Sequence, residues 1–134
     1  RLVLIGSPTG KDGLLGGPGV QICDTTLLHS LGGLVAEIRD LGWNRLFFPC
    51  GEGGLAAAAA KVAREFGGVE INLDSVPTKQ AGMRPMELLG SETAERLVAI
   101  VPEERVEAVV GLANRRGIVA VEIGAIRTSG KVIV

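Results

Sequence analysis

The sequence predicts an α+β fold in which helices cover a mixed β-sheet, with packing partly like that of ferredoxins. Two observations support this. Short apolar runs alternate with longer segments whose apolar residues recur at helical spacing, and glycine-rich turns separate the two kinds of segment. The length of 134 residues is typical of one domain. We expect residues 1–134 to form a single domain, and to be a piece of a longer chain because a strand-like run follows Arg1 directly.

The first predicted elements are a strand, a long loop and a helix. Residues 2–5 are an apolar run of strand length, whereas glycine and proline are too dense in residues 6–19 for a regular element. Aliphatic residues at helical spacing then predict a long helix. Asp24 or Thr25 can act as its N-cap, and Gly42 ends it.

The middle of the chain predicts a second strand, helix and strand. Residues 45–50 have the composition of a buried strand, and the glycine-rich residues 51–54 turn the chain into an alanine-rich helix that ends near Phe66. Residues 69–73 then alternate as a strand. This pattern predicts a β-α-β unit.

A second such unit follows a connection at residues 77–90, which can hold a helical turn over residues 86–89. Residues 96–101 predict a strand, and Pro102 opens a helix at the position where its missing N–H costs nothing. That helix ends at Gly117.

The last expected elements are a strand and a hairpin. Residues 118–127 predict the strand, and a turn at Ser129 and Gly130 predicts a hairpin that returns to Val134. Two β-α-β units in tandem result.

The composition argues against several classes of protein. Fourteen basic and fifteen acidic side chains leave a net charge of -1, so neither nucleic acid nor a membrane is an expected partner. Cys23 and Cys50 lack the neighbours of a zinc site or a disulfide framework, which indicates reduced thiols in a cytoplasmic protein. His29 lies among leucines, and we interpret it as a surface or core-edge residue rather than a catalytic base.

Two glycine-rich segments are candidates for binding phosphate. Gly51, Gly53 and Gly54 lie where a strand ends and a helix begins, and free N–H groups and the helix dipole favour an anion there. The alternative is that this turn simply needs glycine for its geometry. The second candidate segment is Thr9, Gly10, Lys11, Asp12 and Gly13. It combines a hydroxyl, an ammonium and a carboxylate with flexible backbone, which suits phosphate or ribose. The alternative is a surface loop without a ligand.

A third candidate begins at Ser91 and precedes a predicted strand. Glu92, Thr93 and Arg96 offer a carboxylate, a hydroxyl and a planar cation with five N–H donors, which suit a polar ligand. The alternative is a capped turn held by an ion pair.

These segments occur in an order that resembles the formylglycinamide ribonucleotide amidotransferase (phosphoribosylformylglycinamidine synthase) family. The resemblance covers nearly the whole chain, and its last block is the specific one. The matching blocks are residues 9–14 (TGKDGL), 20–24 (VQICD), 49–55 (PCGEGGL), 76–80 (VPTKQ), 85–88 (PMEL) and 91–96 (SETAER). It implies the first of two C-terminal-type domains with the fold of the aminoimidazole ribonucleotide synthetase C-terminal domain.

The resemblance also implies a function. The parent enzyme would convert formylglycinamide ribonucleotide to the amidine with ATP, Mg²⁺ and glutamine-derived ammonia, and this domain would bind substrate without holding a cofactor itself. Its partners would be an N-terminal ATP-binding domain, a glutaminase domain or subunit, and a second copy or pseudo-copy that forms a dimer through an apolar sheet face. The residues implied in substrate binding are Gln21, Ser91, Glu92, Thr93, Ala94 and Arg96.

Two positions depart from the family pattern. The family's metal-binding aspartate corresponds to Pro49, and a glutamine corresponds to Ala94, so we expect no intact metal site in this chain. The resemblance also implies that the catalytic histidine belongs to the ATP-binding domain, so we expect no catalytic residue here. Two hypotheses therefore remain: the substrate-binding part of a working ligase, or a diverged, non-catalytic module that binds a ligand or packs between subunits.

Overall fold

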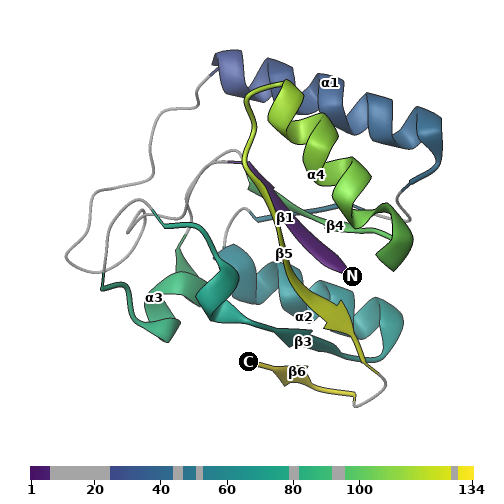
Figure 1. Cartoon of the computed structure of the whole chain (residues 1–134). Coiled ribbons are helices and arrows are strands. Elements are labelled where there is room, and N and C mark those ends of the chain that lie inside the picture. The colour runs from purple at the N-terminus through teal and green to yellow at the C-terminus, as the bar shows by residue number, and fades with distance from the viewer. Residues whose placement is uncertain (7–24, 44–46, 51–52, 79–81, 92–95, 128–129) are drawn as a thin grey trace.

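The computed structural model describes residues 1–6, 25–43, 47–50, 53–78, 82–91, 96–127 and 130–134 (Figure 1). Its strands form one sheet in the order β2-β4-β1-β5-β3-β6. The strands are β1 (Leu2–Gly6), β2 (Phe47–Pro49), β3 (Val69–Ile71), β4 (Arg96–Ile100), β5 (Ala120–Ile126) and β6 (Val132–Ile133). The helices are α1 (Thr25–Leu41), α2 (Gly54–Phe66), α3 (Pro85–Gly90) and α4 (Val106–Arg115), with 3₁₀ turns η1 (Leu73–Ser75) and η2 (Glu103–Arg105).

The crossovers through α1 and α4 each join two parallel strands that have a third strand between them, whereas α2 joins β2 to β3, which lie farther apart in the sheet. β1 is antiparallel to both β4 and β5, and β2 is antiparallel to β4. Therefore β1 and β2, which α1 connects, are parallel with β4 between them. In the same way β4 and β5, which α4 connects, are parallel with β1 between them. This split arrangement confirms the predicted α+β class with ferredoxin-like packing.

The predicted terminal hairpin is wrong. β6 does not pair with β5 but runs parallel to β3, with Val132 opposite Val69. The reason is that β5 already has β1 on one side and β3 on the other, so no free edge of β5 remains. The last strand extends the sheet beyond β3 instead.

Alternate residues of β1 build two separate cores. Leu2 and Leu4 belong to the core beneath α2, whereas Val3 and Ile5 belong to the core beneath α1 and α4. Figure 1 shows α1 and α4 on one face of the sheet and α2 and α3 on the other. Helices therefore occupy both faces, and the expected open apolar sheet face is not found in the described part of the chain.

The start of α4 and the end of β3 differ most clearly from the sequence-based expectation, and β4, β5 and α3 differ from it by one or two residues. Pro102 has an extended ψ of 142° and caps η2, so α4 begins only at Val106. The strand expected over residues 69–73 ends at Ile71, because Asn72 turns the chain and its side chain accepts a hydrogen bond from the Asp74 N–H at 3.0 Å. The ends of α1 and α2 agree with expectation, since Gly42 and Gly67 follow them with positive φ. None of the helices in the described ranges has the length and apolar character needed to span a bilayer.

Candidate functional site

Three segments that the sequence indicates as ligand loops are attached to one end of the sheet. β1 ends at Gly6, directly before residues 7–24, and Gly6 pairs with Arg96, the first residue of β4. β2 ends at Pro49, which pairs with Leu97. Antiparallel pairing thus places the end of β1, the end of β2 and the start of β4 side by side. This end of the sheet is the candidate site.

The glycine turn before α2 has a packing reason of its own. Gly53 and Gly54 have φ of 84° and 63°, which favour glycine. A β-carbon on Gly54 would overlap the carbonyl oxygen of Ser91 and lie 2.9 Å from that of Leu89. Gly54 is buried and Gly53 is exposed. Backbone geometry therefore accounts for both glycines, and close packing is a further reason at the buried Gly54.

The start of α2 retains the features that suit an anion. No side-chain hydrogen bond caps it at Gly53, and its first turn contains no acidic residue. The first N–H groups of a helix have no partner within the helix and lie at the positive end of its dipole. The predicted phosphate contact at Gly53 is compatible with this geometry.

Arg96 is a buried cation that binds the protein's own backbone. Arg96 is only 4% exposed, and its Nη2 donates a hydrogen bond to the carbonyl oxygen of Ser91 at 2.7 Å. Ser91 is fully buried, and its N–H donates to the carbonyl of Glu87 at the end of α3 at 3.0 Å. Of the residues expected to bind substrate, these two are the ones that the structure describes.

Cys50 lies beside this cluster and is chemically inert at neutral pH. It is buried, and its N–H donates to the carbonyl of Arg96 at 3.0 Å. Burial raises the pKa of its thiol to about 11, and the positive charge of Arg96 opposes that rise only in part. The thiol is therefore protonated and is no nucleophile for catalysis.

The remaining expected site residues lie outside the described residues, so the contacts expected of them stay predictions. They are Thr9, Gly10, Lys11, Asp12, Gly13, Gln21, Gly51, Glu92, Thr93 and Ala94.

The described residues at this end form no group that suits a metal ion. Pro49, where the sequence resemblance implies an aspartate in the family, lies exposed on β2, an edge strand of the sheet, where its missing N–H is tolerated. Among the residues that the structure describes, no group of three or more His, Cys, Asp or Glu side chains could hold a metal ion.

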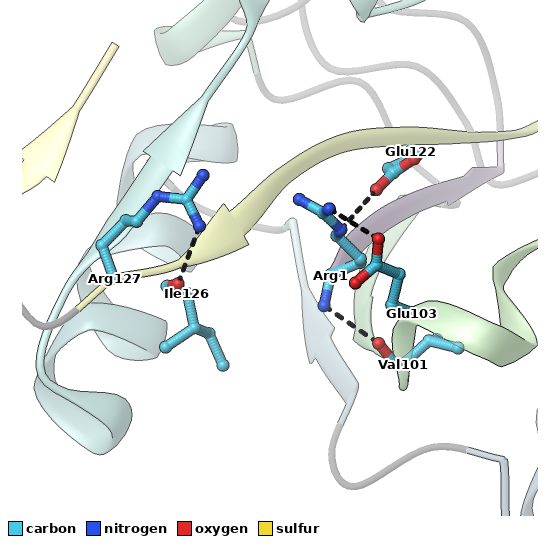
Figure 2. A network of polar contacts seen from close by, with 6 residues as sticks. All are labelled: Arg1, Val101, Glu103, Glu122, Ile126 and Arg127. Carbon is cyan, nitrogen blue, oxygen red and sulfur yellow. Dashed lines mark hydrogen bonds and ion pairs between the residues drawn. The ribbon is translucent and has the colours of Figure 1, made fainter.

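A polar cavity of about 270 Å³ lies near the opposite end of β1, and the sequence did not indicate it. Arg1, Glu122 and Arg127 line it, and Figure 2 shows them in a network of polar contacts. Arg1 contacts Glu103 at 2.9 Å and Glu122 at 3.1 Å, and Arg127 donates a hydrogen bond to the carbonyl of Ile126 at 3.4 Å. Hydrogen bonding to Arg1 and the charge of Arg1 lower the pKa of the Glu103 carboxyl.

The charged side chains around this cavity are paired with partners of opposite sign, since Arg127 also contacts Glu70 at 3.2 Å. Pairing leaves no strong preference for an anion or a cation. No local motif could have revealed these ion pairs, because their residues come from the start of the chain, β3, η2, β5 and the position after β5.

Comparison with known proteins gives a consistent result. A family model described as "AIR synthase related protein, C-terminal domain" matches residues 49–134. Phosphoribosylformylglycinamidine synthase subunit PurL of Parafrankia sp. (strain EAN1pec) is 33% identical in an alignment of 159 residues, which covers 99% of this chain and 20% of that protein. The chain therefore spans about a fifth of the length of this relative.

Solved structures show the same fold. T. maritima PurL complexed with FGAR superposes with a TM-score of 0.85 at 24% identity, covering 93% of this chain and 23% of that one. T. maritima PurL complexed with ATP has a TM-score of 0.84 at 24% identity, covering 93% and 21%. The resemblance seen in the sequence motifs is confirmed.

Proposed function

Because the chain belongs to the AIR synthase related protein C-terminal domain family, we propose that it is the substrate-binding domain of an ATP-dependent ligase of purine biosynthesis. The ligase converts formylglycinamide ribonucleotide to formylglycinamidine ribonucleotide with glutamine-derived ammonia. The observation that carries the proposal is the similarity to a phosphoribosylformylglycinamidine synthase subunit over 99% of this chain.

The proposal assigns two groups of residues to the ligand site, whether they contact the ligand or support residues that do. Ser91 and Arg96, the described members of the substrate group, and Gly53, in the phosphate group, lie at the same end of the sheet, which supports a common site. The substrate group is Gln21, Ser91, Glu92, Thr93, Ala94 and Arg96. The phosphate group is Thr9, Gly10, Lys11, Asp12, Gly13, Gly51, Gly53 and Gly54.

The rest of the reaction is assigned to other parts of the enzyme. A relative solved with ATP supports ATP as the activating nucleotide of the parent protein. An N-terminal domain would hold that ATP, and a glutaminase domain or subunit would supply ammonia, in a cytoplasmic homodimer or pseudo-dimer. The described residues of this chain do not fit a Mg²⁺ site, so no step of the proposal uses Mg²⁺ here. Within the parent, residues 1–134 act as one binding domain.

Calorimetric titration with formylglycinamide ribonucleotide tests the proposal. We expect saturable binding with one site per chain, and weaker binding of the riboside that lacks the phosphate. Glu92→Gln removes a proposed ligand contact and should weaken binding, whereas Glu104→Gln, at an exposed position on η2, should not. Absence of saturable heat, or equal affinity for nucleotide and riboside, would overturn the proposal.

A further inference from the structure

Gly54 and Arg96 contact the same backbone carbonyl from two different elements. The Nη2 of Arg96 donates to the Ser91 carbonyl oxygen at 2.7 Å. A β-carbon on Gly54 would overlap the same oxygen. The carbonyl of Ser91 is thus held between the start of β4 and the start of α2.

The groups that hold this carbonyl are themselves fixed. The backbone of Arg96 pairs with Gly6 of β1, and its carbonyl accepts a hydrogen bond from the Cys50 N–H at 3.0 Å. The Ser91 N–H donates a hydrogen bond to the carbonyl oxygen of Glu87 in α3 at 3.0 Å. Four elements, α2, α3, β1 and β4, therefore determine where Ser91 lies.

From this geometry we propose that Arg96 is a positioning residue, which acts on the ligand through the Ser91 carbonyl rather than by contact. The inference rests on the proposed function, in which the residues between Ser91 and Arg96 contact substrate. Arg96 is 4% exposed and its guanidinium binds a protein carbonyl, so little of its surface is available to a ligand. Its hydrogen bond ties the two ends of the six-residue SETAER block together.

The physical basis is that binding groups must be held close to their productive positions. A site depends on residues whose own placement is locked by packing and by hydrogen bonds from behind. Removing the Arg96 donor would leave a buried carbonyl without this bond. Adding a methyl group at Gly54 would push the same carbonyl from the other side. Both changes should therefore disturb the site in the same way.

Calorimetry with formylglycinamide ribonucleotide on five variants tests the inference. Arg96→Met and Gly54→Ala should each weaken binding about tenfold, which corresponds to one lost buried hydrogen bond. The double variant should bind no more weakly than the weaker single variant, because both act through one carbonyl. Arg96→Lys, which keeps a donor, should recover part of the affinity. Gly111→Ala is the matched control, since nothing lies within 4 Å of a β-carbon there.

Amide hydrogen exchange gives a measurement that does not need the ligand. Arg96→Met and Gly54→Ala should both speed exchange of the Ser91 amide at the end of α3 and leave the Val109 amide in α4 unchanged. If the wild-type chain does not bind the nucleotide, the proposed function fails while exchange still decides whether the two residues hold Ser91. Unchanged exchange in both variants, or loss of affinity in Arg96→Met with none in Gly54→Ala, would overturn the inference.

Discussion

The carbonyl oxygen of Glu70 in β3 lies so close to Gly124 in β5 that a β-carbon at residue 124 would overlap it. Gly124 also pairs with Leu2, next to an irregularity in the β1–β5 register. Two neighbouring strands therefore enclose this position. We expect Gly124→Ala to lower the free energy of unfolding by about 1–3 kcal/mol, because the β3 backbone must shift. Urea unfolding measures the change.

Gly111→Ala is the matched control for this substitution. Gly111 lies inside α4 with open space around it, and alanine costs a helix less conformational entropy than glycine. The free energy of unfolding should stay the same or rise by roughly 0.5–1 kcal/mol. Equal destabilisation by both variants would contradict the close packing of β3 on β5.

The buried thiol of Cys50 should make stability fall at alkaline pH. Its pKa in the folded chain is about 11, above the ordinary value of 9.0. A raised folded-state pKa means that the folded protein holds the proton more tightly than the unfolded chain. The protonated thiol therefore contributes fully to the free energy of unfolding below pH 9.0, and this contribution is lost as the pH rises through about 11. The loss should be roughly 2 kcal/mol.

Urea unfolding between pH 8 and pH 11 measures this loss when wild type is compared with Cys50→Ala. Other titrating groups are common to both proteins, so the difference in slope reports on Cys50. Parallel stability curves for the two proteins would show that the thiol does not titrate as the burial of Cys50 requires.

The purified chain should hydrolyse no ATP. The proposed function places the nucleotide in another domain, and the described residues contain no cluster that could hold a metal ion. His29 is exposed on α1, distant in sequence from the candidate site residues of β4. Release of inorganic phosphate should equal that of a buffer control, with and without formylglycinamide ribonucleotide. Turnover that survives repeated purification would contradict the assignment of catalysis to other parts of the enzyme.

Local patterns in the sequence predicted most of the helices and strands. Gly42 and Gly67 ended α1 and α2 as expected, because a positive φ at the C-terminus of a helix strongly favours glycine. The order of strands was not predictable in this way. The pairing of β6 with β3 depends on both sides of β5 being taken, which is a property of the whole sheet.

The candidate site was predictable in its residue types but not in the direction of its contacts. The block from Ser91 to Arg96 stood out because it combines polar groups before a strand. Nothing in that spacing indicated that the Arg96 guanidinium would bind the Ser91 carbonyl in the protein interior. The close approach of Gly54 to the same carbonyl, which leaves no room for a β-carbon, arises from the packing of α2 against the end of α3, which only the folded chain reveals.

The most direct test of the central claim is an NMR titration of the chain with formylglycinamide ribonucleotide, which shows where the ligand binds. We expect the largest amide shift changes at Gly6, Cys50, Gly53 and Arg96, where the three ligand loops meet the sheet. Glu70 and Asn72, which line the cavity near the other end of β1, should change little. Changes centred on Glu70 and Asn72, or no saturable change anywhere, would contradict the account.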